Sequence, residues 1–228
     1  MKIIAKIKND FKEKFGIPRQ SGIARNMLSR IVFEPEYRVR EALRGIEEYS
    51  HLWLIWEFSE AKREGWSPTV RPPRLGGNKR MGVFATRSPY RPNPIGLSSV
   101  KLVSVDESEG EGLVLTVSGA DLLDGTPIYD IKPYLSFTDS HPDAVCGFAD
   151  RVKEQRLSVN FPEELLMKVS QDARDTLIIV LEGDPRPHYK TDPDYEYGMR
   201  HGDYEIKFKV AGDALTVTGI ETIPPKRV

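Results

Sequence analysis

Two arginines in a proline-rich stretch are the residues of this chain that most clearly could bind a ligand. Residues 82–97 read GVFATRSPYRPNPIGL, in which Arg87 and Arg91 lie among three prolines. Each proline fixes φ and removes a backbone donor, so this stretch is a shaped loop and not a helix interior or a central strand. Guanidinium groups bind phosphate oxygens through paired hydrogen bonds. A rigid loop with two of them is suited to a ligand that carries phosphates.

The positive character extends over a longer window. Between residues 65 and 105 the chain has seven basic side chains and no acidic one, although its formal net charge is −1. A second proline-rich segment, RPPRLGGNKR, occupies residues 71–80. The near-neutral total charge excludes a protein that is cationic throughout, so a nucleic-acid partner would bind a local patch.

Composition and short motifs exclude several other classes. The single cysteine has no internal partner and the four histidines are scattered, so we expect no metal site. Lysines interrupt the N-terminal apolar run, so we expect no signal peptide and no membrane span, and a cytoplasmic protein. The glycine-rich turn of the doubly wound nucleotide fold, the P-loop, the GxSxG elbow and the zinc deaminase signature are all missing from the sequence. Composition and spacing alone name no reaction.

Short alternating segments dominate the first 135 residues and are typical of strands. Between two of them, DESEGEG at 106–112 predicts a hairpin turn, and apolar spacing in residues 37–46 predicts an amphipathic helix. Many short strands with few helices predict a closed or nearly closed β-barrel. The expected strands are residues 3–8, 30–34, 51–58, 98–105, 112–119 and 128–135.

The composition changes after residue 142. Residues 161–174 begin with a proline and two glutamates before an apolar periodic run, which predicts a helix. Residues 175–182 fit either a helix or a buried strand, and residues 204–210 and 215–223 predict a hairpin. We therefore predict a mainly β protein, with a β-barrel domain at residues 1–138 and a small α+β domain at residues 139–228.

Six motifs occur in an order that resembles one known family. They are FGIPRQ at 15–20, HLWLIW at 51–56, GW-P-TVRPPRLGG across 65–77, MGVFATRSPYRPNPIGLS at 81–98, DGTPIYDIKPY at 124–134 and DPRPHY at 184–189. This pattern is similar to that of the tRNA N6-threonylcarbamoyladenosine N6-methyltransferases. The resemblance implies a β-barrel that binds S-adenosylmethionine without the usual Rossmann fold, and it covers most of the chain.

The resemblance also implies a cofactor site. Ser59 stands where members often have a histidine, so it lacks an imidazole's flat face and makes a weaker or different contact. Leu97 would pack on the purine of S-adenosylmethionine, and Arg87 or Asp124 would form an ionic interaction with its charged methionine end. The residues that match the family's S-adenosylmethionine pocket are Pro18, Arg19, Gln20, Ser59, Glu60, Arg87, Leu97, Asp124, Gly125, Thr126 and Pro127.

The implied reaction is methyl transfer to N6 of threonylcarbamoyladenosine at position 37 of tRNA, beside the anticodon. Asp130, Tyr134, Asp184 or the substrate itself would accept the proton, and the sequence does not choose among them. The family is dimeric, so a homodimer is expected. Arg186 is expected at the modified nucleotide, and the expected phosphate contacts are Arg71, Arg74, Lys79, Arg80 and Arg91.

Two other kinds of protein fit the same residues. One is a non-catalytic RNA-binding barrel that uses the arginines without a cofactor. The other is an enzyme that clamps a free nucleotide or a small phosphate compound. Binding of tRNA that is indifferent to S-adenosylmethionine would favour the first, and indifference to tRNA would favour the second.

Overall fold

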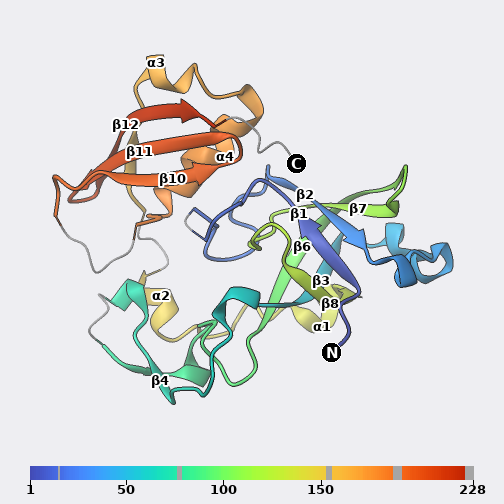
Figure 1. Cartoon of the computed structure of the whole chain (residues 1–228). Coiled ribbons are helices and arrows are strands. Elements are labelled where there is room, and N and C mark those ends of the chain that lie inside the picture. The colour runs from blue at the N-terminus through green and yellow to red at the C-terminus, as the bar shows by residue number, and fades with distance from the viewer. Residues whose placement is uncertain (15, 76–78, 153–155, 187–191, 224–228) are drawn as a thin grey trace.

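The structure, a computed structural model, describes residues 1–14, 16–75, 79–152, 156–186 and 192–223. Figure 1 shows two β-sheet regions, one from the first part of the chain and one from the red C-terminal strands. Part of the blue N-terminal chain lies between them. The prediction of a mainly β fold is confirmed.

Six strands form a closed barrel in the order β1-β2-β7-β6-β3-β8, and β8 closes it by pairing with β1. Side chains in a strand point alternately to its two faces, so alternating apolar residues give one buried face. In β3, for example, Leu52, Leu54 and Trp56 are buried while the residues between them are partly exposed. The barrel strands are β1 (Ala5–Lys8), β2 (Leu28–Phe33), β3 (His51–Glu57), β6 (Ile95–Ser108), β7 (Gly112–Ser118) and β8 (Pro127–Pro133). The expected hairpin joins β6 to β7.

Short elements connect the barrel strands. The helix predicted at 37–46 is wrong: Pro35 starts a 3-10 turn, and Gly45, with φ of 85°, interrupts the chain before another. The apolar side chains that suggested a helix, Leu43 and Ile46, still pack against the barrel core. The connecting elements are η1 (Pro35–Tyr37), η2 (Arg40–Leu43), η3 (Ile46–Glu48), η4 (Ser59–Ala61), β4 (Thr69–Val70), η5 (Pro73–Leu75), β5 (Met81–Gly82) and η6 (Val83–Ala85).

The C-terminal sheet has the order β10-β11-β12-β9. The single helix predicted at 161–174 is wrong: two helices stand there, because extended Ser170 separates them and gives its backbone N–H to Tyr204 Oη at 3.0 Å. The ambiguous run at 175–182 is helical, and the predicted hairpin is present. The elements are α1 (Ser136–Asp139), α2 (Phe148–Val152), β9 (Ser158–Asn160), α3 (Glu163–Leu166), α4 (Gln171–Glu182), β10 (Tyr197–His201), β11 (Tyr204–Ala211) and β12 (Ala214–Thr222).

The described residues form two hydrophobic cores, one inside the barrel and one between the C-terminal sheet and α4. Residues 9–27, which we call the 9–27 loop, connect β1 to β2, yet several of their described apolar side chains belong to the second core. Phe11, Ala24 and Met27 are buried there among C-terminal residues. The position of Gly16 is tight as well, since a Cβ on it would lie 2.5 Å from Met199 Sδ. The loop is therefore packed between both parts of the molecule.

Candidate functional site

The 9–27 loop meets the proline-rich segment at Gln20 and Arg87. The Nη1 of Arg87 donates a hydrogen bond to Oε1 of Gln20, although 67 positions separate the two residues. Both side chains are largely exposed. The loop that precedes β6 is held rigid by its own contacts, because Arg91 Nη1 donates to the carbonyl oxygens of Val83 and Thr86 at 3.2 and 2.7 Å.

The turn at residues 124–127 lies against the start of the same loop. Asp124 Oδ1 accepts the backbone N–H of Asn9 at 2.9 Å, and its Oδ2 pairs with Lys12 Nζ at 2.8 Å. Gly125 has φ of 77°, a conformation that glycine adopts without strain, and its N–H donates to Ile7 O at 2.8 Å. The carboxylate of Asp124 thus fixes the turn to β1 and its continuation.

The remaining expected cofactor residues lie around these contacts with varied exposure. Glu60 forms an ion pair with Lys14 of the 9–27 loop at 3.0 Å, and Ser59 beside it is exposed. Leu97 lies on the outer face of β6, where 57% of it is exposed. The 9–27 loop therefore contacts the segments that hold Glu60, Arg87 and Asp124.

The sequence reading missed one acidic residue, Asp121, on which the charge of Arg87 acts. Asp121 Oδ1 accepts a hydrogen bond of 2.5 Å from Ser98 Oγ, and Ser98 accepts one of 2.9 Å from Trp56 Nε1. Burial raises the pKa of Asp121, while hydrogen bonds from Ser98 and from backbone amides of Asp121 and Ser21, and the charge of Arg87, act in the opposite direction. The only sequence signal was an acid placed three residues before the DGTP motif.

The first motif also reaches the C-terminal part of the chain. Arg19 Nη2 donates to the carbonyl oxygen of Asp184 at 2.6 Å, and the carboxylate of Asp184 pairs with Arg186 Nε at 3.0 Å. Asp184 has φ of 55°, a left-handed conformation unusual for a residue other than glycine. A small hollow of about 30 Å³ beside Pro18 and Arg19 has room for about one water molecule. Of the DPRPHY motif, residues 187–189 lie outside the described part.

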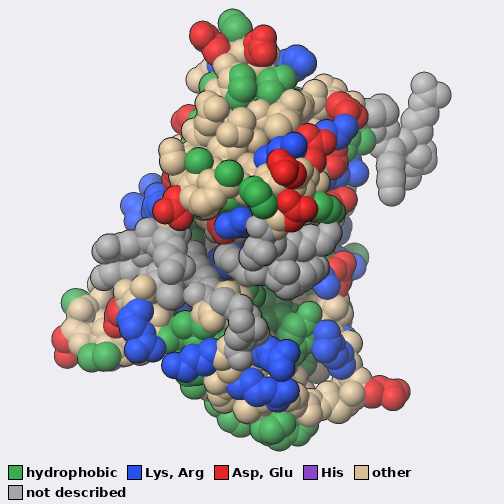
Figure 2. Space-filling view, turned by 90° about the vertical axis from the view of Figure 1, so that its left-hand side faces the viewer, with side chains coloured by type: hydrophobic (Ala, Val, Ile, Leu, Met, Phe, Trp, Pro, Cys, Tyr) green, Lys and Arg blue, Asp and Glu red, His purple; other side chains and the backbone are tan. Residues whose placement is uncertain are grey.

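Lysine and arginine side chains gather in the lower part of the face in Figure 2, at the height of β4 in Figure 1. Arg71, Lys79 and Arg80 are exposed near the short β4–β5 hairpin, and Arg80 Nη1 donates to Thr69 Oγ1 at 3.1 Å. The backbone of Arg74 lies in η5, but its side chain is outside what the structure describes. The expected phosphate contacts are thus only partly placed.

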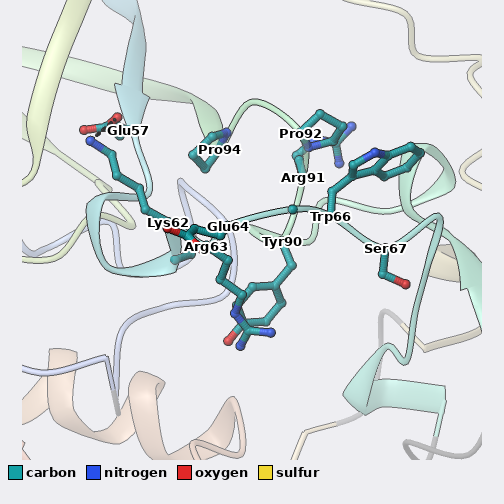
Figure 3. Close-up of a pocket in the computed structure, with 12 residues that line it drawn as sticks. Glu57, Lys62, Arg63, Glu64, Trp66, Ser67, Tyr90, Arg91, Pro92 and Pro94 are labelled. Carbon is teal, nitrogen blue, oxygen red and sulfur yellow. Dashed lines mark ion pairs between the residues drawn. The ribbon is translucent and has the colours of Figure 1, made fainter.

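An open cavity of about 470 Å³ lies beside this surface, between β3 and the proline-rich loop (Figure 3). At one end Lys62 pairs with Glu57 at 2.9 Å, and the Arg63 guanidinium lies 3.9 Å from the centre of the Tyr90 ring. Burial acts to raise the pKa of Glu57, but hydrogen bonds from Tyr129 and Lys62 outweigh it and the pKa is lowered. Trp66, 53% exposed, adds a second aromatic side chain to a lining that also holds Glu57 and Glu64 and that the sequence reading did not single out.

The three candidate proton acceptors lie apart. Asp130 on β8 pairs with Lys132 at 2.9 Å, and opposes Ile55 of β3, which in turn opposes Leu97 of β6. Tyr134 packs on Trp53, with 5.4 Å between ring centres. Asp130 and Tyr134 therefore belong to β8 and the residue after it, whereas Asp184 belongs to the C-terminal part of the chain.

Two negative findings concern only the described residues. No helix in this part of the chain is long and apolar enough to cross a membrane. Within the same ranges, no group of three or more His, Cys, Asp or Glu side chains is placed to hold a metal ion.

Comparison with known proteins gives matches over nearly the whole chain. The chain is 40% identical to a tRNA (adenine(37)-N6)-methyltransferase of Escherichia coli over 226 residues, with 96% of each chain covered. It is 39% identical to a putative S-adenosylmethionine-dependent methyltransferase of Pseudomonas aeruginosa, with 89% of each covered. A crystal structure of TrmO from Pseudomonas aeruginosa matches with a TM-score of 0.72 and 34% identity, covering 96% of this chain and 97% of that one.

Two family models divide the chain between them. The model described as the tRNA-methyltransferase O N-terminal domain matches residues 6–140, and the TrmO C-terminal domain matches residues 154–223. The first range holds the barrel and the second holds β9 to β12 with α3 and α4. The chain therefore belongs to the TrmO family.

Proposed function

We propose that this protein transfers a methyl group from S-adenosylmethionine to N6 of threonylcarbamoyladenosine at position 37 of tRNA. The observation that carries the proposal is a contact between two of the family motifs. In this TrmO-family chain, Arg87 of the 81–98 motif donates a hydrogen bond to Gln20 of the 15–20 motif, 67 positions away. The relatives named above are described as acting on adenine 37 of tRNA or as using S-adenosylmethionine.

The residues around Arg87 fit the cofactor in charge and polarity. The exposed Arg87 guanidinium suits the cofactor's carboxylate, and the outward Leu97 offers an apolar surface to a purine. Asp124 already binds Asn9 and Lys12, so we assign it to shaping the 124–127 turn and to holding that turn against β1. The 30 Å³ hollow beside Pro18 and Arg19 is too small for the cofactor, so we place the cofactor on the Arg87 side.

S-adenosylmethionine supplies an electrophilic methyl group on a sulfonium. The lone pair of the target nitrogen is delocalised into a carbonyl and a purine, which makes its proton more acidic and its alignment decisive. On this proposal the chain's contribution is orientation, with Asp130 or Tyr134 as the proton acceptor, since both lie at the barrel face next to β3.

For tRNA, we propose the surface of Arg71, Arg74, Lys79 and Arg80, together with the cavity in Figure 3. Unpaired bases of an RNA loop stack on aromatic rings and on guanidinium planes. Trp66, Tyr90 and Arg63 offer both beside an acid-free cationic segment. Arg186, held by Asp184, is proposed to bind the modified nucleotide, and Arg91 to add a phosphate contact beside its own loop bonds.

A second copy of the chain would complete this site. Ile95 and Leu97 are 37% and 57% exposed on the outer face of β6, so the proposed cofactor surface is open on one side. We therefore propose a homodimer, which sedimentation at working concentration tests. Since the proposed substrate is tRNA, we place the protein in the cytoplasm.

The decisive experiment uses labelled S-adenosylmethionine with tRNA that carries or lacks the threonylcarbamoyl group, followed by mass spectrometry of nucleosides. We expect N6-methylated threonylcarbamoyladenosine only with the modified tRNA. An Arg87→Gln variant should reduce the product strongly, whereas Arg40→Gln, in an exposed ion pair with Glu107, should not.

The two alternatives give different results in the same assay. Binding of tRNA without methyl transfer would support a non-catalytic RNA-binding barrel. Methylation or binding of a small nucleotide with indifference to tRNA would support a small-molecule enzyme. Methylation of unmodified tRNA would keep the enzyme class but reject the proposed nucleotide.

A further inference from the structure

Asp121 occupies a position that the proposed function does not yet use. Its carboxylate is hydrogen-bonded to Ser98 in the barrel wall, and both Ser21 of the 9–27 loop and Arg87 act on its charge. It accepts the Ser98 hydroxyl at 2.5 Å, and the backbone amide of Ser21, the residue that follows Gln20, acts to lower its pKa. The Arg87 charge acts on it directly. One carboxylate thus touches or attracts groups next to both members of the Arg87–Gln20 pair.

The barrel fixes the orientation of this carboxylate. Ser98 is buried on β6, and its oxygen accepts the indole N–H of Trp56 at 2.9 Å while its proton goes to Asp121. Trp56 is itself fixed, because its ring covers Gly96 so closely that a Cβ there would lie 2.2 Å from it. The hydroxyl is therefore held in one orientation by a donor on one side and an acceptor on the other.

The electrostatics of the cofactor give this arrangement a purpose. S-adenosylmethionine carries a carboxylate, an ammonium and a sulfonium, so its net charge is positive, whereas its product S-adenosylhomocysteine has a neutral thioether. An unbalanced Arg87 would attract the carboxylate of both ligands but repel the sulfonium of one. A carboxylate within reach of Arg87 removes that repulsion.

We propose that Asp121 is a positioning residue of the cofactor site, which orders Arg87 and residues 20–21 and balances the Arg87 charge so that a sulfonium is accepted. This inference rests on the proposed function, because it takes S-adenosylmethionine as the cofactor. It assigns to Asp121 a selectivity between cofactor and spent product, and not a contact with the transferred methyl group.

The test is calorimetric binding of both ligands to wild type and to Asp121→Asn, which removes the charge but keeps an oxygen for Ser98. We expect the affinity for S-adenosylmethionine to fall relative to that for S-adenosylhomocysteine by about tenfold, as one unit charge several ångströms away produces in a partly hydrated site. A residue that only supported the loop would weaken both ligands by the same factor.

The chain offers a matched control on β6, the strand that holds Ser98. Asp106 Oδ2 accepts a 2.5 Å hydrogen bond from Ser104 Oγ, as Asp121 does from Ser98, and Asp106 lies roughly 25 Å along β6 from Ser98. Asp106→Asn makes the same change in net charge and should leave the ratio of the two affinities unchanged. If Asp106→Asn moves the ratio as much, the effect is not local and the inference is wrong.

A second variant keeps the inference testable if Asp121→Asn folds poorly. Arg87→Gln leaves Asp121 in place and should shift the ratio the other way, toward S-adenosylmethionine, even as the affinity for both ligands falls. In the double variant the two shifts should largely cancel. An unchanged ratio in Asp121→Asn and in Arg87→Gln overturns the inference alone, whereas a wild type that binds neither ligand overturns the proposed function.

Discussion

The guanidinium of Arg19 donates a 2.6 Å hydrogen bond to the backbone carbonyl oxygen of Asp184, 165 positions away. This bond joins the 9–27 loop to the turn that follows α4, and it lies beside the ion pair of Asp184 with Arg186. The bond therefore links Arg19, in the segment expected to bind the cofactor, to Asp184, which holds the Arg186 expected to bind the nucleotide. A change at either end should therefore be felt at the other.

Replacing Arg19 by alanine should destabilise the protein and weaken cofactor binding. The carbonyl of Asp184 is partly buried, and a buried acceptor left without a partner costs about 1–3 kcal/mol. Urea unfolding and calorimetry measure the two effects. The control is Arg25→Ala in the same loop, since Arg25 donates an exposed, longer bond of 3.2 Å to Gly22. Equal losses in the two variants would argue against a special role for Arg19.

Replacing Gly96 by alanine should destabilise the barrel strongly. The added methyl would lie 2.2 Å from the buried Trp56 indole, and overpacking of this kind costs about 1–3 kcal/mol or more. Gly82→Ala is the matched control, because a Cβ there has no neighbour within 4 Å among the described residues. Thermal unfolding of both variants measures the difference. If Gly96→Ala unfolds like Gly82→Ala, the indole does not cover residue 96.

Stability should fall in acid because of His201. This side chain is 4% exposed and packs edge-on against Phe11 of the 9–27 loop, with 5.9 Å between ring centres. Burial lowers its pKa, which the charge of Asp10 only partly offsets. A depressed pKa means that its contribution to stability is complete above about pH 6.5 and is lost as the pH falls through the folded-state pKa.

Urea unfolding of His201→Leu between pH 5 and pH 7 tests this assignment. The wild-type stability should change by at most about 1.4 kcal/mol per pH unit from this group, and the variant should lose that slope. His141→Gln, an exposed histidine, serves as the control and should keep the wild-type slope. A variant at position 201 with an unchanged slope would assign the pH dependence to other groups.

Asp121→Asn should be at least as stable as wild type at neutral pH. Burial raises the pKa of Asp121, so its contribution to stability is present below about pH 3.8 and is lost as the pH rises through the folded-state pKa. The neutral amide avoids that loss. The stability difference between variant and wild type, from urea unfolding, should thus grow between pH 4 and pH 7. A variant that loses stability most at pH 7 would show that the charged carboxylate contributes net stability despite its burial.

Replacing Arg71 by glutamine should weaken tRNA binding without changing its sequence preference. Removing one phosphate contact lowers the slope of log affinity against log salt by about 1. Titrations of tRNA at several salt concentrations measure this slope. Lys101→Gln is the control: it removes an equally exposed charge from β6 outside the β4–β5 region and should leave the slope unchanged. Equal slopes for Arg71→Gln and wild type would place the RNA elsewhere.

Local patterns in the sequence predicted most strands but not how they meet. The alternation around Leu52 and Leu54 was sufficient for β3, because burial on one face requires only a period of two. The apolar spacing of Leu43 and Ile46 led to the wrong prediction of a helix at 37–46, since 3-10 turns bring the same side chains onto the barrel. Closure of the barrel through β8 and β1 depends on pairing across more than 100 positions, which no local pattern encodes.

The candidate site divides in the same way. The family resemblance selected Gln20 and Arg87, which do lie in contact. It did not select Asp121, whose role is visible only when Ser98, 23 positions earlier, is placed beside it. It also did not indicate that Nη1 of Arg91 donates hydrogen bonds to the backbone of its own loop. Roles that depend on a neighbour far along the chain were the ones that the sequence alone could not assign.

Phe11, Ala24 and Met27 are buried in a core that is otherwise built from the last third of the chain. A ribosome releases a chain from its N-terminus, so these residues emerge long before the strands that cover them. The loop that carries Gln20 therefore reaches its final packing only after the C-terminal strands that cover it have left the ribosome. In a nascent chain, the contact between Gln20 and Arg87 would therefore be supported by a packed loop only long after both residues have emerged.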